Sequence, residues 1–518
     1  MAKAKTEKTR PREELMAQRK HVTLDARSEQ LAINVLGWRG GRPYVNERLS
    51  RFSGESNIDW EGGDRSQFLI GKKSKRGNSS YRENITGRRE QTHNIPYLGR
   101  FVSKINQYTL GESPKREGID PEFKEDVSRD GWTIDQIMSE VNSYLTVCKW
   151  CWIKIDAPEV EEEVSIADKK KKKLRPYWTV KDPRQIVDWK ITSDGVVQWV
   201  LDEWEDYVAD DPREEPETIT YRTLWEPGKI TRYRLSKDKS KIVETTEKEI
   251  SLKKIVPYVP VGHLSALPHW FDDTEGVNRS MLNLGSVNYA NFFRCAYPQP
   301  YLPDSVLQTV QDSFNVTSAE AMNMIMGYNY PILLSKDDPT PGYMEVEASS
   351  MATLRAELTA LGDEMHSTIG MVNPNPTKQV QSGISKEYDL KDLEAVVMER
   401  ATILERAESR AAEISKEWDI TFSTWTPEYN RSIDVGTFKE DLDAIAKVSG
   451  MPMPTPLYRM LLSKLMERAK KIGTGKMSPE EETEIIEAIK AFEVSDINMD
   501  LTQPDTLPLP KLNDGDTD

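Results

Sequence analysis

Two cysteines separated by two residues, Cys148 and Cys151, have the first spacing in this chain that suggests chemistry. A C-x-x-C pair supports thiol–disulfide exchange when it lies at a helix N-terminus, where the helix dipole lowers a thiol pKa. Here the pair falls where a helix is expected to end and a strand to begin. A zinc site would need further ligands, and the chain has three cysteines in all. We favour two ordinary cysteines, with a redox or metal site as the alternative.

Other catalytic patterns are incomplete. The segment 473–476 (GTGK) lacks the upstream glycine of a phosphate-binding loop, and Met477 stands where that loop needs Ser or Thr. The sequence has no G-x-S-x-G and no H-E-x-x-H motif. The five histidines are scattered and lack neighbouring acids at metal-ligand spacing: His21, His93, His263, His269 and His366. We predict a protein that is not an enzyme and has no cofactor and no metal site.

Composition narrows the class of protein. The 518 residues are enough for more than one domain, with 37% hydrophobic and 30% charged residues. We expect no membrane partner, because no apolar run reaches the roughly 20 residues of a membrane-spanning helix. The N-terminal segment has no apolar core and does not resemble a signal peptide. Few cysteines suit a reducing compartment such as the cytoplasm.

Charge is unevenly distributed along the chain. Residues 1–116 carry 24 Lys/Arg and 13 Asp/Glu, whereas 117–518 carry 46 and 72. An acidic body does not hold nucleic acid by releasing counterions. The basic arm at residues 1–30 is expected to be disordered, with contact to nucleic acid or an acidic partner as the alternative.

The first half of the chain predicts a mixed α/β body. A helix is expected to lead into a strand at Trp152–Ile155, and Val187, Trp189 and Ile191 alternate with polar residues as in a half-buried strand. Turns at Asp194-Gly195 and Pro227-Gly228 indicate two β-hairpins. The charge run 169–173 (KKKKK) is expected to be a solvated loop, with a basic docking patch as the alternative.

Helical periodicity returns near residue 276. One expected helix carries an apolar stripe at Val277, Met281 and Leu284; a second carries Leu354, Leu358, Leu361 and Met365. The longest stripe occupies 385–418, where apolar residues recur every three or four positions: Leu390, Leu393, Val397, Ala401, Leu404, Ala407, Ala411, Ile414 and Trp418. A short strand is expected to follow at 420–425.

Two Asn-Pro pairs, Asn373-Pro374 and Asn375-Pro376, lie between the last two of these expected helices. Each proline lacks an amide hydrogen, and the residue before each proline is restricted to extended conformations, so no helix runs through 373–376. The break needs an explanation, because it separates a long helix from a longer one.

The order of these elements resembles that of a tailed-bacteriophage portal protein. The resemblance rests on five stretches: 144–156 (YLTVCKWCWIKID), 180–191 (VKDPRQIVDWKI), 255–284, 327–371 and 381–419. Together with the elements between them, it covers about Tyr81 to Phe492.

The resemblance implies an α+β fold with these parts in chain order: the basic arm (1–30), an α/β wing (31–274), a first stem helix (275–297), a small α/β clip (298–347), a second stem helix (348–371), a tunnel loop (372–384), a spine helix with a wing return strand (385–434), a helical crown (435–492) and an acidic, Pro-rich disordered tail (493–518). It also implies a homo-oligomeric ring of twelve subunits in the virion, assembled in the host cytoplasm.

On this resemblance, the loop residues face double-stranded DNA in the channel: Asn373, Pro374, Asn375, Pro376, Lys378, Gln379, Gln381, Ser382 and Gly383. The clip residues contact the large terminase and later the head-completion, adaptor and tail proteins: Met322, Met324, Met326, Tyr328 and Tyr330. The major capsid protein is a further expected partner. An ordinary interhelical loop and a buried intersubunit core are the alternatives for the two sets. The alternative for the whole chain is another capsid-associated or head–tail connector protein.

Overall fold

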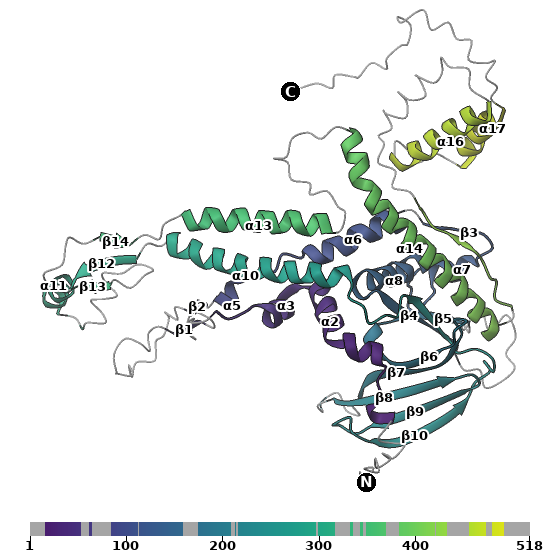
Figure 1. The fold of residues 1–518 in the computed structure, drawn as a ribbon, viewed down its shortest axis with the longest axis horizontal. Coiled ribbons are helices and arrows are strands. Elements are labelled where there is room, and N and C mark those ends of the chain that lie inside the picture. Colours follow the sequence, from purple (N-terminus) through teal and green to yellow (C-terminus); the bar gives the residue numbers. More distant parts are fainter. Residues whose placement is uncertain are drawn as a thin grey trace, which may run out of the picture. The chain divides into compact units, whose positions relative to one another are not determined.

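A computed structural model describes residues 16–52, 62–64, 84–86, 88–111, 113–158, 175–208, 213, 216–296, 299–315, 317, 332–334, 342–344, 349–368, 383–419, 421–431, 455–472 and 479–491. The chain is α+β and divides into two units, Met1–Ile433 and Asp434–Asp518 (Figure 1).

The first unit holds all of the described strands. Its helices are α2 (Val22–Arg39), α3 (Gly41–Arg48), α5 (Arg88–Gln91), α6 (Tyr97–Leu110), α7 (Pro121–Glu125), α8 (Ile134–Cys148), the 3-10 helix η2 (Pro183–Gln185), α10 (Trp270–Ala296), α11 (Asp304–Phe314), α13 (Ser349–Thr368) and α14 (Gly383–Trp418). Its strands are β1 (Gly62–Asp64), β2 (Asn84–Thr86), β3 (Lys115–Arg116), β4 (Trp150–Asp156), β5 (Tyr177–Lys181), β6 (Ile186–Ile191), β7 (Val197–Val208), β8 (Glu217–Glu226), β9 (Lys229–Leu235), β10 (Ile242–Glu249), β11 (Tyr258–Gly262), β12 (Gln299–Pro303), β13 (Ile332–Leu334), β14 (Gly342–Met344) and β15 (Pro427–Glu428).

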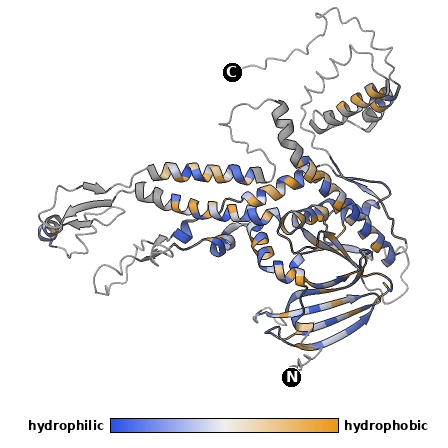
Figure 2. Cartoon of the chain, in the orientation of Figure 1, coloured by the Kyte–Doolittle hydropathy of each residue, from blue (hydrophilic) through white to orange (hydrophobic). Residues whose placement is uncertain are grey.

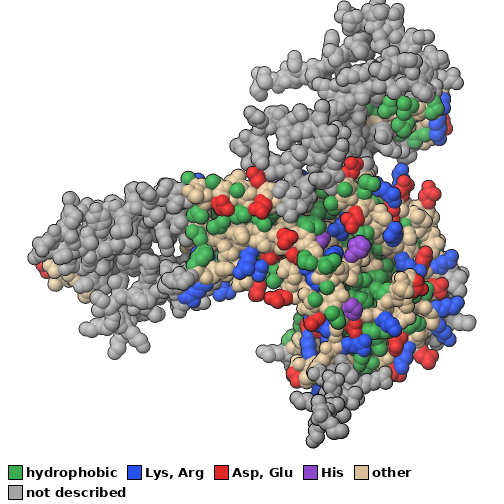
Figure 3. Space-filling model, in the orientation of Figure 1, with side chains coloured by type: hydrophobic (Ala, Val, Ile, Leu, Met, Phe, Trp, Pro, Cys, Tyr) green, Lys and Arg blue, Asp and Glu red, His purple; other side chains and the backbone are tan. Residues whose placement is uncertain are grey.

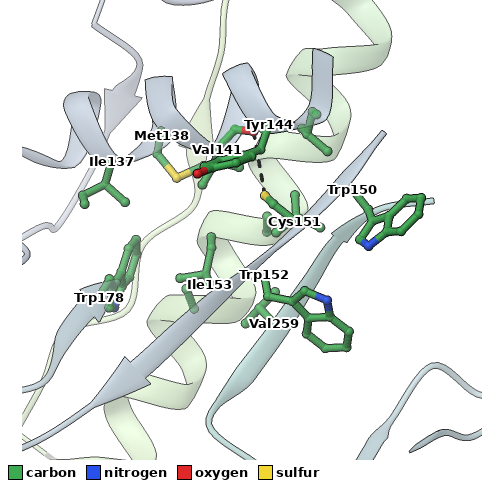
Figure 4. Close-up of a cluster of buried hydrophobic side chains, with 14 of the residues drawn as sticks. Ile137, Met138, Val141, Tyr144, Trp150, Cys151, Trp152, Ile153, Trp178 and Val259 are labelled. Carbon is green, nitrogen blue, oxygen red and sulfur yellow. Dashed lines mark hydrogen bonds between the residues drawn. The ribbon is translucent and has the colours of Figure 1, made fainter. Parts of the chain in front are cut away.

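Helix α8 and the sheet β11-β4-β5 form the centre of this unit. Thr133 and Gln136 cap the start of α8 reciprocally, each side chain accepting from the backbone N–H of the other residue. Apolar side chains of α8 lie directly over β4, whose Trp150, Trp152 and Ile153 are fully buried (Figure 4). The predicted helix-to-strand transition is therefore confirmed.

A glycine permits the close approach at this transition. Gly262 of β11 has φ +85°, and a Cβ there would lie 2.4 Å from the carbonyl oxygen of Lys149. A side chain at position 262 would therefore clash with the turn between α8 and β4.

The second sheet has five antiparallel strands in the order β10-β9-β8-β7-β6. Both predicted hairpins are confirmed, because β6 pairs with β7 across the Asp194-Gly195 turn and β8 pairs with β9 across Gly228. The sheets share one core, in which the Tyr258 hydroxyl of β11 donates to Asp202 of β7 at 2.7 Å.

The predicted alternation of buried and exposed residues in β6 is wrong at Asp188. Its side chain was expected to face solvent, but the residue is 5% exposed. The Arg19 guanidinium donates to its carboxylate, and the Trp189 N–H donates to Oδ1. The burial of this acid is thus explained by a cation 169 positions away in sequence.

The prediction of a disordered arm over 1–30 is wrong for its second half. Helix α2 starts at Val22, and Leu24, Arg27 and Leu31 are buried in the main core. Met16 and Arg19 carbonyls accept hydrogen bonds from Arg222 of β8. The segment from about residue 16 onward therefore belongs to the α/β body: residues 16–21 contact strands β6 and β8, and α2 packs on α6, α8 and α10.

Two other expectations also change. The predicted strand at 420–425 is absent from the described residues 421–425, and the strand in this region is β15, which pairs with β3. The helix α14 begins at Gly383, so Gly383 stands in that helix and not in the preceding loop.

The second unit contains α16 (Thr455–Ile472) and α17 (Pro479–Ala491), which contact each other. Both lie in the predicted helical crown. The other residues of that predicted range (435–454, 473–478 and 492) and the predicted tail, 493–518, fall outside the described residues.

Candidate functional site

Helices α10 and α13 form an extended pair beside the α/β body (Figure 1). Polar and apolar residues alternate along both helices, as expected for helices with one buried face (Figure 2). In sequence, the described residues between α10 and α13 form a small three-stranded sheet, order β13-β12-β14, and helix α11. The chain therefore leaves the body along one helix and returns along another.

The predicted stripes of this pair meet in one apolar cluster. Met281 of α10 and Met365 of α13 are buried together, and the half-buried Val277, Leu358 and Leu361 pack against them. Leu284 and Leu354 are also half-buried. A Cβ at Gly362 would lie 3.9 Å from the Met281 Cε, so the end of the Met281 side chain lies beside Gly362.

The same cluster attaches the pair to the body. It includes Phe101 and Ile105 of α6, and it also takes in Leu393 of α14. His366 contacts the Phe101 ring edge-on, with the ring centroids 5.1 Å apart. The last turn of α13 and an early part of α14 are consequently fixed on the same helix, α6.

The residues between those two fixed points are 369–382. They contain both Asn-Pro pairs and every predicted tunnel-loop residue except Gly383, and they lie outside the described residues. The predicted contact residues of the clip, Met322 to Tyr330, also lie outside them. Both assignments stay predictions.

Helix α14 buries the predicted stripe along most of its length. Leu393, Val397, Ala401, Leu404, Ala407, Ala411 and Ile414 are at most 4% exposed, and Trp418 packs against the main core. Its alanines allow the close approach of β4 and β11, which α14 contacts. Leu390 lies on α14, but its side chain is not described.

A buried carboxylate on α14 binds the segment that follows the helix. Glu408 accepts from Arg116 Nε, from Trp425 Nε1 and from the Tyr429 hydroxyl, each at 2.6 Å. Burial raises the pKa of Tyr429, and the neighbouring Glu408 raises it further, so the phenol stays a donor. This network holds the return segment against the body.

The N-terminal end of α10 is anchored by α2, which sequence reasoning did not find. Arg27 donates to both Asp272 oxygens, at 2.5 and 3.0 Å, and Asn34 donates to Asp272 at 2.8 Å. Burial opposes ionisation of Asp272, but the hydrogen bonds from Arg27 and the His269 N–H outweigh it and lower the pKa. The spacing of Leu24, Leu31 and Val35 was the available signal for a helix here.

One turn further along α10, Glu275 forms a second anchor. It accepts from Arg48 and from the Tyr44 hydroxyl, and Tyr44 in turn accepts from Asn278 at 2.9 Å. The helix that leads out of the body is thus bound at its base by two buried polar clusters, which fix its direction relative to the body.

The C-x-x-C pair has the environment of structural cysteines. Both thiols are free and buried, and the Cys151 thiol points at α8, where the Val141 carbonyl accepts from it at 3.8 Å (Figure 4). Burial raises the pKa of both thiols, so the reactive thiolate is disfavoured. Among the described residues, no three His, Cys, Asp or Glu side chains gather as a metal site would require.

The chain is similar to known proteins in structure, and no protein-family model and no curated protein matches it in sequence. It is similar to a chain in the virion of a native gene transfer agent particle, with 9% identity, a TM-score of 0.39, and coverage of 71% of this chain and 90% of that one. A chain in the neck of an empty gene transfer agent particle gives 9% identity, a TM-score of 0.38 and the same coverage.

The chain is also similar to a phage portal protein. That protein is an HK97-family portal protein from Corynebacterium diphtheriae, with 9% identity, a TM-score of 0.30, and coverage of 68% of this chain and 93% of that one. Among the described residues, no helix is both long and apolar enough to span a membrane.

Proposed function

We propose that this chain is a portal protein of a tailed bacteriophage or a related particle. Twelve copies would form a ring around a channel for double-stranded DNA. The ring would admit DNA during packaging, release it during ejection, and dock the large terminase first and adaptor or tail proteins later.

One observation carries the proposal. Helix α10 leads out of the α/β body to a small α/β insert, and α13 leads back from the insert to the body. The long helix α14 then packs across the body. Met365 near the end of α13 and Leu393 near the start of α14 pack in one apolar cluster with α6. In sequence, residues 369–382 connect these two anchored helices, which supports their assignment as a loop that contacts a passing ligand.

Two further features support a structural role. The reactive form of the C-x-x-C pair is disfavoured by burial. On the face seen in Figure 3, basic and acidic side chains of the described residues are interspersed, and they form no large basic patch there that would hold DNA. A conduit must let DNA slide, so a surface without strong attraction suits it.

Electron microscopy of the purified full-length chain tests the proposal. We expect end-on class averages that show rings of about twelve subunits with a central hole wide enough for duplex DNA. An ATP hydrolysis assay on the same sample is expected to give no turnover that survives repurification. Monodisperse monomers at every protein concentration and salt tested would refute the ring and reopen the function.

A further inference from the structure

A groove lies between the long helix α14 and the edge strand β11. Its cavity has a volume of about 340 Å³. One wall is α14, the other is β11 with the residues before it, and the β6–β7 turn closes one side. The lining includes Val196, Val256, Ile403, Arg406, Arg410 and Ile414.

The groove combines an apolar floor with a basic rim. Arg406 and Arg410 stand one turn apart on α14 and are both exposed. Arg410 binds Glu413 at 2.6 Å, whereas Arg406 has no ion-pair partner in the described part of the chain. Residues 117–518 are acidic overall, so this rim departs from its surroundings. A matching occupant would carry carboxylates next to exposed apolar side chains.

Carboxylates next to exposed apolar side chains occur at the C-terminal end of strand β7, the strand that begins beside the groove. Tyr207 is 70% exposed and Val208 is 38% exposed. Asp206 precedes them and has no ion-pair partner among the described residues. In sequence, residues 206–217 contain six carboxylates and one arginine, although Glu217 already binds Lys237. We call Asp206, Tyr207 and Val208 the acidic tip.

Strand geometry makes the acidic tip and the groove separate surfaces. Strand β7 begins beside the groove at Val197 and ends at the tip, 12 residues in all. At about 3.3 Å per residue, its ends are roughly 36 Å apart, so one copy cannot place its own tip in its own groove. Two different surfaces that complement each other join copies head to tail, and such a contact forms a ring when its rotation closes.

We propose that the acidic tip of one copy docks into the groove of the neighbouring copy. Asp206 would face Arg406, while Tyr207 and Val208 would cover the apolar floor. The inference rests on the proposed ring and names one contact that would close it.

A charge exchange in the full-length chain tests the contact. The variants are Arg406→Glu, Asp206→Arg and the two combined, with Tyr207→Ser to remove the apolar part. Lys416→Glu, also exposed on α14, and Glu249→Arg, exposed on β10, are matched controls outside the two surfaces. Mass photometry and end-on electron microscopy measure the protein concentration at which half of the chains are in rings.

Each single variant is expected to raise that concentration about tenfold or more, which corresponds to about 1.4 kcal/mol per contact. The combined variant should return to within about threefold of wild type, and the controls should not change. Rings that form normally in both charge-reversal variants, Arg406→Glu and Asp206→Arg, or a combined variant that assembles worse than either, would overturn the contact and leave the ring standing. A wild-type chain that never assembles would overturn the ring and the contact together.

Discussion

His269 lies where α8 ends and α10 begins, in surroundings that disfavour the charged form of its ring. Its Nε2 donates to the Thr146 carbonyl oxygen at 2.9 Å, which fits the neutral ring protonated at Nε2. Burial lowers the pKa of His269 to about 4; repulsion from Arg400 and Lys149 adds to this, while the hydrogen bond and Asp272 act in the opposite direction.

This pKa makes the stability of the fold depend on pH. An unfolded histidine titrates near 6.5, so between about pH 6.5 and 4 the unfolded chain binds the additional proton. Stability contributed by neutral His269 is therefore present above pH 6.5 and is lost as the pH falls toward 4. With allowance for its partial exposure, the loss is about 2 kcal/mol.

The substitution His269→Gln isolates that contribution, because a glutamine can still donate to the Thr146 carbonyl without gaining a proton. We expect wild type to lose more stability than this variant between pH 6.5 and 4, by about 2 kcal/mol. Thermal unfolding of both chains across this window measures the difference. His263→Gln, at an exposed position, is the control; parallel curves for wild type and His269→Gln would contradict the assignment.

At the scale of elements, the sequence predicted best the helix with the most repeated pattern. Helix α14 was expected from 385 to 418 and occupies Gly383–Trp418, because its apolar residues keep one register over many turns. The stripes expected on α10 and α13 also meet in one apolar cluster, which includes all of their predicted residues except Leu284 and Leu354. Each of these helices packs by its own apolar face, so the sequence of the helix alone contains the signal.

Helix α2 was missed because polar residues interrupt the apolar spacing of its buried face. Helix α2 buries Arg27 and Asn34, and these residues are stable in the core because Asp272 lies opposite them. Asp272 is 245 positions from Arg27 and 238 from Asn34, so no local sequence pattern could predict that these residues pair. Asp188 was misplaced for the same reason, since Arg19 neutralises it. Whether such a polar residue is buried depends on a partner that is distant in sequence, and hydrophobic periodicity does not predict that partner.

The segment between α13 and α14 supplies a prediction at this scale. Replacing Asn373–Ser382 with a shorter Gly-Ser linker should leave rings intact, because Met365 and Leu393 anchor the flanking helices independently of the loop. It should reduce the DNA packaged or retained in particles, because the prolines that restrict the loop and its one cation, Lys378, are lost. Nuclease-protected DNA in assembled particles measures the effect.

The single substitution Lys378→Ala separates charge from shape in that experiment. A loss of DNA equal to that of the linker variant would assign the effect to the cation, and a smaller loss would assign it to the restricted loop. Full-length packaging by the linker variant would contradict the tunnel-loop assignment itself.

At the scale of the whole molecule, charge sets how a ring of this chain would meet DNA. The formal charge is −15 per chain, so twelve copies would carry −180, twelve times that value. Screening limits the field to about 8–10 Å at physiological salt, so it acts mainly on DNA that is already inside the channel. The wall would then repel a phosphate backbone from all sides, and the DNA would pass without a lasting contact.

This argument predicts that purified rings do not retain duplex DNA. In a gel-shift or filter-binding assay with a linear duplex at about 0.15 M salt, we expect no stable complex. Any binding at low salt should come from the basic segment 1–15 (charge +2, from five Lys/Arg and three Asp/Glu), and its removal should abolish that binding. Rings that hold duplex DNA at physiological salt after this deletion would contradict the electrostatic argument, because attraction would then arise from the body, whose formal charge opposes it.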